Sequence, residues 1–135
     1  MRRSRTERSV RLSEAIAPYG PSPTTHPGAG SAENVWLPAI VGRIVRLVDP
    51  VRIVLFGSRA RGTAREESDY DLLVVLDEVT DRRGTSIAIR RTLADLPISK
   101  DIIVATTAET DGSASKPRGV LHWALVEGRA VYERP

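Results

Sequence analysis

The chain has no cysteine and few aromatic residues: two tryptophans, three tyrosines and one phenylalanine among 135 residues. The absence of cysteine excludes disulfides, thiolate catalysis and cysteine-ligated zinc, and it fits a reducing compartment. No apolar run is long enough to span a membrane, and none follows the first arginines as in a secretory signal. We therefore expect a cytoplasmic protein without membrane contact, whose core is built from valine, isoleucine, leucine and alanine.

The charge balance argues against a protein that coats nucleic acid, because 20 basic residues face 17 acidic ones and the net charge is only +3. Arginines cluster in the first eleven residues, and prolines and glycines then punctuate the chain up to about residue 33. We interpret residues 1–33 as a flexible Arg- and Pro-rich extension and residues 34–135 as one domain. Nucleic-acid binding through these arginines is the weakest of the alternatives considered.

Helical and strand patterns alternate from Leu37 onward. Apolar residues recur at helical spacing from Leu37 to Val48 and predict an amphipathic helix. The further elements expected are a strand over 51–56, a short helix from 58 to about 64, a strand over 70–76, a helix over 85–96 with Ile87, Ile89, Leu93 and Leu96 facing inward, a strand over 98–105, a loop over 109–118, a helix over 120–127 capped by Gly128, and a short strand at 131–132. This order predicts an α/β (α+β) domain with a small mixed sheet and helices packed on it.

A candidate phosphate site lies where the strand over 51–56 ends. Gly57 has no Cβ, so its backbone can come close to a phosphate oxygen, and Ser58 adds a hydroxyl donor at the start of a helix whose amides point the same way. A plain turn, in which Ser58 only caps the helix, is the structural alternative. Arg59, Arg61 and Arg65 could face triphosphate oxygens, although Arg61 could equally pair with an acidic residue.

Three carboxylates form a candidate metal site. Asp69 and Asp71 are two residues apart at the next strand, so their side chains share one face and suit a hard cation such as Mg²⁺. Asp101 opens the following strand, which we expect to neighbour Asp71, and it could bind metal or take the proton of an attacking hydroxyl. An isolated pair of this kind, with Ser68 as a turn former, would be structural. Its position after a strand-Gly-Ser-helix unit favours chemistry on a nucleoside triphosphate.

Histidine and tryptophan have no catalytic role in this interpretation. His26 lies in the Pro-rich stretch and His122 in a predicted helix, so a catalytic histidine is not expected. Trp36 and Trp123 are expected to pack against the core rather than to stack on nucleobases.

Residues 57–71 resemble a known signature. Gly57-Ser58, ten intervening residues and Asp69-x-Asp71 look like the motif of the nucleotidyltransferase superfamily with the polymerase β-like fold. The variant Gly-Ser-x-Ala-Arg-Gly, the continuation Ser-Asp-x-Asp-Leu-Leu-Val and the ending over 124–133 are similar to the minimal nucleotidyltransferases of prokaryotes. The resemblance covers residues 36–134. It implies two Mg²⁺ ions, a nucleoside triphosphate, and transfer of the nucleoside monophosphate to a hydroxyl with release of pyrophosphate.

The resemblance also implies residue roles and a partner. By position, Gly57 and Ser58 contact phosphate, while Asp69, Asp71 and Asp101 are the metal ligands and catalytic residues. Proteins of this kind act as antitoxins of helical HEPN-domain toxins, and some attach AMP to a toxin tyrosine. We therefore expect an adenylyltransferase that uses ATP and a hydroxyl presented by another protein. The alternative is a non-catalytic antitoxin or binding module that neutralises its partner by direct contact.

Overall fold

The domain is built on a four-stranded sheet. The computed structural model describes residues 34–112 and 115–135, and its strands lie in the order β4-β3-β2-β5. β3 pairs in parallel with β4 and antiparallel with β2, which in turn pairs antiparallel with β5. The predicted mixed sheet is therefore confirmed. The strands are β2 (Arg52–Phe56), β3 (Tyr70–Leu76), β4 (Lys100–Thr106) and β5 (Arg129–Glu133).

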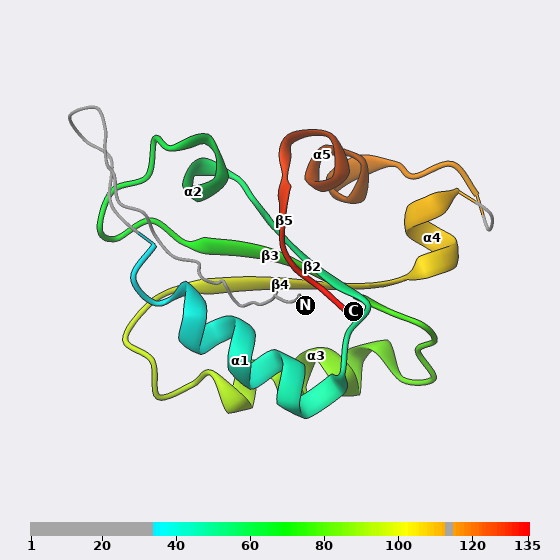
Figure 1. Cartoon of the computed structure of the whole chain (residues 1–135), viewed down its shortest axis with the longest axis horizontal. Coiled ribbons are helices and arrows are strands. Elements are labelled where there is room, and N and C mark those ends of the chain that lie inside the picture. The colour runs from blue at the N-terminus through cyan, green and yellow to red at the C-terminus, as the bar shows by residue number, and fades with distance from the viewer. Residues whose placement is uncertain (1–33, 113–114) are drawn as a thin grey trace. The chain divides into compact units, whose positions relative to one another are not determined.

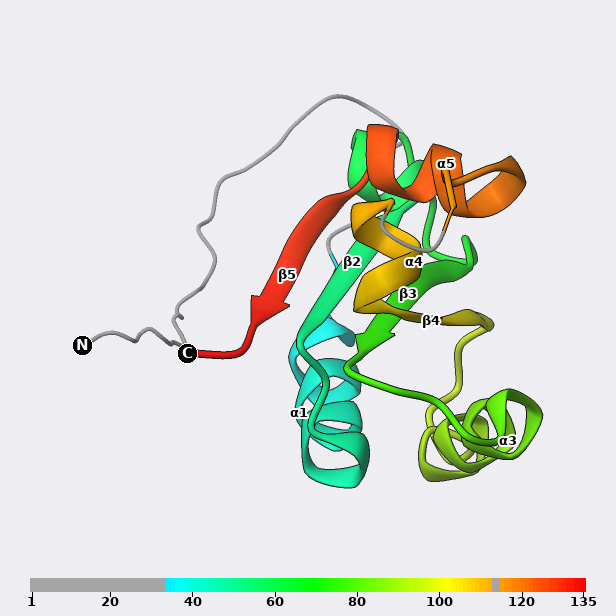
Figure 2. The same cartoon turned by 90° about the vertical axis from the view of Figure 1, so that its right-hand side faces the viewer.

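Helices cover both faces of this sheet. They are α1 (Leu37–Val48), α2 (Ser58–Arg61), α3 (Arg82–Thr92), α4 (Thr107–Asp111) and α5 (Gly119–Glu127). α1 and α3 lie on one face, whereas α2, α4 and α5 lie on the other (Figures 1 and 2). Because both faces are covered, β3 is a continuous apolar run after its first two residues, as expected for a strand buried on both sides.

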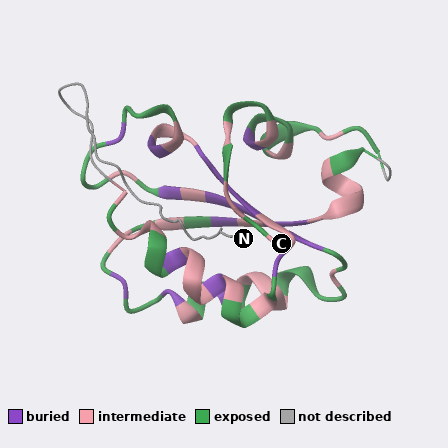
Figure 3. Cartoon of the chain, in the orientation of Figure 1, coloured by how far each residue is buried: buried purple, intermediate pink, exposed green. Residues whose placement is uncertain are grey.

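The alternation of side chains along β3 decides which face carries the candidate site. Leu72 and Val74 belong to the core with Ile40 and Ile44 of α1, whereas Leu73 and Val75 pack with Ala124 of α5. Asp71 is two residues before Leu73, so its side chain points to the same face of the sheet, the α5 face. Figure 3 shows the buried strands between the two helical layers.

Two elements have the bounds that the sequence predicts, and the others shift. α1 and β3 span the predicted residues, while β2, β4 and β5 differ from the prediction by one or two residues at one or both ends. α2 ends at Arg61 rather than near residue 64, because Gly62 takes a left-handed conformation (φ 80°) and its N–H bonds to the carbonyl of Ser58.

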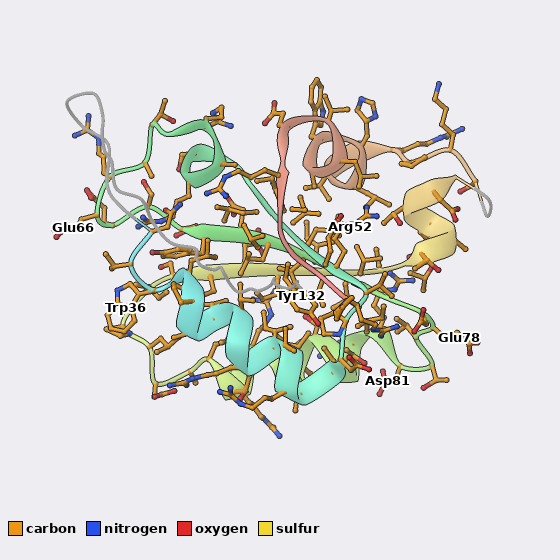
Figure 4. The ribbon with its side chains drawn as sticks, viewed as in Figure 1. Trp36, Arg52, Glu66, Glu78, Asp81 and Tyr132 are labelled. Atoms are coloured by element: carbon orange, nitrogen blue, oxygen red, sulfur yellow. The ribbon has the colours of Figure 1, made fainter. Side chains whose placement is uncertain are left out.

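The prediction for α3 is wrong at both ends and at one core position. The helix begins three residues earlier, where Asp81 (labelled in Figure 4) accepts a hydrogen bond from the Gly84 amide as N-cap, and it ends at Thr92. Ile87 is 39% exposed, while Ile89 is fully buried. Residues two apart on a helix lie on nearly opposite sides, so both could not face inward.

The segment after β4 differs from the expected loop. α4 occupies its start, with Thr106 and Glu109 forming a reciprocal capping box. α5 ends at Gly128 as predicted, but this residue is extended rather than left-handed. A Cβ there would lie 2.4 Å from both the Ala124 carbonyl and Val54. Trp123 is 56% exposed, so the prediction that it packs in the core is wrong.

Several predictions fall outside these residues. The extension over 1–33, its arginines and His26 lie outside the described residues. Of the helices that the structure describes, none has the length and apolar character needed to cross a membrane.

Candidate nucleotidyl-transfer site

Gly57 and Asp71 are pressed together at the junction of β2 and α2. Gly57 has φ 76° and ψ −158°, a conformation open essentially only to glycine, and a Cβ there would lie 2.2 Å from Oδ2 of Asp71. Phe56 pairs with Asp71 across the antiparallel β2–β3 ladder, which brings the glycine to the carboxylate. Glycine is thus required here both by backbone conformation and by the space that the carboxylate occupies.

Ser58 follows as the first residue of α2. Its hydroxyl makes no capping hydrogen bond to the described helix, and the N-cap is Gly57. The N-cap position that the structural alternative gave to Ser58 is thus occupied by Gly57 in the described helix. Since first-turn amides of a helix have no acceptor within it, the Ser58 N–H also points away from the α2 ladder.

Arg59 is a buried cation that organises the loop before the aspartates. It is 5% exposed, and its guanidinium donates to the carbonyls of Arg65 (3.2 Å), Glu66 (2.9 Å) and Ser68 (3.0 and 3.1 Å). The Glu66 side chain itself points outward from this loop (Figure 4). Ser68 closes the same loop, because its hydroxyl accepts from the Arg65 amide at 2.8 Å, as expected of a turn former. Arg59 therefore positions the chain that leads into Asp69.

The same guanidinium ties the loop to the start of the domain. It lies over the Tyr70 ring at 4.1 Å from the centroid, and it donates to Oδ1 of Asn34 at 3.2 Å. The Tyr70 hydroxyl in turn accepts from the Trp36 amide at 3.3 Å, and burial raises the pKa of this tyrosine. Trp36 packs against the core, as predicted. Nothing in the motif itself signals Asn34, which lies 25 residues upstream of Arg59.

Asp71 and Asp101 lie side by side on neighbouring strands. The parallel β3–β4 register pairs these two residues directly, so their side chains leave the same face of the sheet. Burial raises the pKa of the Asp71 carboxyl, and the negative charges of Asp101 and Asp69 raise it further, while Arg61 lowers it. The structure therefore brings all three predicted carboxylates within electrostatic reach of one another.

Asp101 is held at the edge of the sheet rather than over the centre of the site. Its carboxylate lies 3.7 Å from Nη2 of Arg90, a residue of α3 that reaches it from the opposite face. Within residues 34–112 and 115–135, no three histidine, cysteine, aspartate or glutamate side chains are arranged to hold a metal ion. The three carboxylates therefore interact electrostatically, but they do not converge on one point as metal ligands do.

Arg61 lies on the open side of the site. Nη1 lies 3.3 Å from Oε1 of Glu127, at the end of α5, and the two side chains are 52% and 38% exposed. The structure shows Arg61 paired with an acidic residue, and its charge also lowers the pKa of Asp71, while contact with a triphosphate stays a prediction. Glu127 was not singled out from the sequence. Only the packing of α5 beside α2 brings it to the site.

Residues 37–120, more than half of the chain, match the nucleotidyltransferase domain family. The chain belongs to this family. A protein from Sulfolobus solfataricus that is assigned as a nucleotidyltransferase has the same fold, with a TM-score of 0.53 and 20% identity over 79% of this chain and 94% of that chain. At this identity the likeness shows the fold of the nucleotidyltransferase domain and nothing finer.

Two toxin–antitoxin crystal structures resemble the nucleotidyltransferase domain more weakly. One contains AMP-PNP and has a TM-score of 0.47 at 19% identity, covering 71% of this chain and 73% of that chain. The other is a mutant of the MntA–HpeT pair, with a TM-score of 0.43 at 18% identity over 70% and 71% of the chains. No curated protein matches the sequence.

Proposed function

We propose that this nucleotidyltransferase moves AMP from ATP to a hydroxyl group of a partner protein with the help of Mg²⁺, and that it acts as the antitoxin of a helical HEPN-type toxin whose tyrosine receives the AMP. The observation that carries the proposal is the placement of Asp71. Its side chain lies against Gly57, where β2 ends, and the residue pairs with Asp101 of the neighbouring strand β4. A position where backbone can approach phosphate is thereby joined to carboxylates that suit a hard cation.

The donor set fits Mg²⁺ in its chemistry. Asp69, Asp71 and Asp101 offer only carboxylate oxygens, and the charges of the other two aspartates raise the pKa of Asp71, so a cation beside them would relieve their repulsion. These three residues would hold the metal only after their carboxylates turn toward a common point, since they are not so arranged in the described residues. When bound, Mg²⁺ would neutralise phosphate oxygens and make the acceptor hydroxyl easier to deprotonate.

The residues of the chain divide the remaining work. Gly57 and Ser58 bind the triphosphate, and Arg61 supplies a positive charge beside it. Arg59 positions the loop that carries Asp69 and does not contact nucleotide in this proposal, because its guanidinium is buried among carbonyls. The acceptor oxygen bonds to the α-phosphorus as the bond to the pyrophosphate oxygen breaks, and Asp101 takes the hydroxyl proton.

A protein acceptor is supported by the resemblance of residues 57–71 to the minimal nucleotidyltransferases of prokaryotes. The toxin as partner is supported by the same resemblance.

The test uses ATP radiolabelled at the α-phosphate, Mg²⁺ and the product of the neighbouring gene. We expect the label on that product, a mass increase of one AMP at a hydroxyl side chain, and loss of both with Asp69→Asn/Asp71→Asn. ATP labelled at the γ-phosphate is the matched control and should transfer nothing. Transfer of the γ label would make the protein a kinase. If neither label transfers but wild type and double variant both co-purify with the product, the protein is a binding module.

A further inference from the structure

An open groove of about 600 Å³ runs between α3 and β4. It is lined by Arg82, Arg83, Ser86, Ile87 and Arg90 of α3 and by residues 102–104 of β4. β4 is an edge of the sheet, since among the described strands it pairs only with β3. The groove lies outside the site built around Gly57 and Asp71.

The groove offers hydrogen-bond donors and few acceptors. Arg82 donates to the carbonyl of Val104 at 2.6 Å and Arg90 to that of Ile102 at 3.3 Å, so the outward carbonyls of the edge strand are already used. The N–H of a strand residue points to the same side as its C=O, which places the amides of Ile102 and Val104 on the groove side. The described lining includes no acidic residue. A ligand that fits this surface must be rich in acceptors.

One of the three arginines has no structural explanation. Arg82 pairs with Glu109 at 2.9 Å and Arg90 with Asp101, whereas Arg83 makes no ion pair with any residue in the described ranges. Arg83 also lies in the first turn of α3, where the helix dipole disfavours a positive charge. Its charge therefore serves neither the helix nor a neighbouring carboxylate, and it is available to a negatively charged ligand.

Arg90 connects the groove with the candidate site. The same Nη2 atom contacts the Ile102 carbonyl in the groove and the Asp101 carboxylate on the other side of β4. A chain that lies along the edge of β4 passes Asp101 as it leaves the groove. This is the carboxylate to which the proposed function assigns the acceptor proton.

We infer that the groove binds an extended acidic segment of the protein that presents the acceptor hydroxyl. The groove presents an apolar side chain on its α3 wall, Ile87, which is 39% exposed, and amides two residues apart suit the carbonyls of an extended peptide. A nucleic acid is disfavoured because none of the described lining residues is aromatic and able to stack on a base. The role of the segment as acceptor rests on the proposed function, whereas the binding of an acidic segment does not.

Two variants of the full chain distinguish binding in this groove from a general effect of the protein's net charge. Arg83→Ala/Ile87→Asp changes the groove, and Arg46→Ala/Leu47→Asp makes the same chemical changes on α1, where Arg46 is exposed and Leu47 is 46% exposed. Each lowers the net charge by the same amount. Neither removes a buried side chain or an ion pair between described residues. The α1 variant should unfold at a slightly lower temperature than wild type, because it removes a cation and adds an anion in the last turn of its helix, so binding is measured well below both unfolding temperatures.

The probe is a fluorescent random copolymer of glutamate and tyrosine, with binding measured at about 0.15 M salt. We expect the groove variant to bind about tenfold more weakly than wild type and the α1 variant to stay within about twofold of it. Equal loss in both variants, loss in neither, or no binding by wild type would each overturn the inference. Tighter, groove-dependent binding of single-stranded poly(A) would also overturn it, because the groove would then be a nucleic-acid site.

The transfer assay keeps this inference apart from the proposed function. If groove-dependent binding of the copolymer persists but AMP is never transferred to the neighbouring gene product, the proposed function fails and the groove remains a site for acidic segments. If AMP is transferred equally well by wild type and the groove variant, the assignment of the groove to the acceptor fails and the proposed function stands.

Discussion

The two halves of the candidate site are built in different ways. The half on residues 57–71 is fixed from inside the domain: Arg59 is 5% exposed and bonds to three main-chain carbonyls, and Gly57 lies against Asp71. The half on β4 rests on Asp101, whose side chain is 61% exposed and is paired at 3.7 Å with Arg90, whose side chain is 48% exposed. The comparison teaches that the half to which the proposed function assigns the nucleotide is preorganised, while the half to which it assigns the acceptor can adjust to what it binds.

The largest effect on stability is expected from Arg59→Met. The substitution keeps the length of the side chain but removes the donors to three main-chain carbonyls and to Asn34, and we expect a loss of about 3 kcal/mol in the free energy of unfolding. Urea denaturation measures it. Hydrogen exchange of the amides over 65–69 should also speed up, because the loop loses its anchor.

Arg61→Met is the matched control, two residues along the same helix. Its ion pair with Glu127 is half-exposed, so the loss should be no more than about 1 kcal/mol. Equal losses from the two substitutions would contradict the distinction between a positioning arginine and one on the open side of the site.

Gly57→Ala should have the next largest effect. Both the backbone conformation and the 2.2 Å approach to Asp71 oppose a Cβ, and we expect a loss of about 2 kcal/mol together with weaker binding of ATP and Mg²⁺ by calorimetry. Gly62→Ala is the control, because Gly62 has φ 80° but nothing within 4 Å of its Cβ. It should cost about 1 kcal/mol and leave nucleotide binding unchanged. Equal effects on nucleotide binding would show that the approach to Asp71 does not matter.

The sequence predicts the first half of the site well because its signals are local. Gly57 directly follows one strand, and the two aspartates lie two residues apart at the start of the next, β3, which has the predicted bounds. The alternation of helices and strands favours β4 lying beside β3, whereas the pairing of Asp71 with Asp101 also depends on the register of the two strands. The buried role of Arg59 was not predictable, because its partners come from main-chain carbonyls and from Asn34.

The contacts around Asp101 are harder to predict from the sequence. Arg90 reaches it around the edge of the sheet, a contact that only the packing of α3 creates. The predicted start of α3 is three residues late because it rests on apolar spacing and not on the Asp81 cap. The helix α4 was missed although Thr106-x-x-Glu109 carries the signature of a capping box. The sequence contains signals for both caps, whereas it contains no signal for the contact between Arg90 and Asp101.

Arg90→Met should have a small effect on stability, because it breaks an exposed ion pair and one hydrogen bond to the edge of β4. We expect a loss below about 1 kcal/mol in urea denaturation, well under that of Arg59→Met. A loss as large as that of Arg59→Met would mean that the acceptor-facing half is as firmly fixed as the other, and the comparison between the halves would fail.

The smallest effect concerns the electrostatic coupling between the halves. Burial raises the pKa of Asp71 above its ordinary 3.8, and the charge of Asp101 contributes next. In Asp101→Asn the Asp71 pKa should therefore fall but stay above 3.8, because burial remains. Titration of the Asp71 carboxyl carbon by NMR without metal measures it. Asp69→Asn should give a smaller fall, because the charge of Asp69 contributes less than that of Asp101.

The sign of the stability change follows from the same shift. Because the folded state binds the Asp71 proton more tightly than the unfolded state, this group destabilises the fold as pH rises from 3.8 through the raised pKa, and the whole penalty is present above it. Asp101→Asn should lessen this penalty near pH 7 and have no such effect below pH 3.8. An unchanged Asp71 pKa in this variant would mean that the two halves are electrostatically independent. Asp101 would then have to act on the acceptor alone.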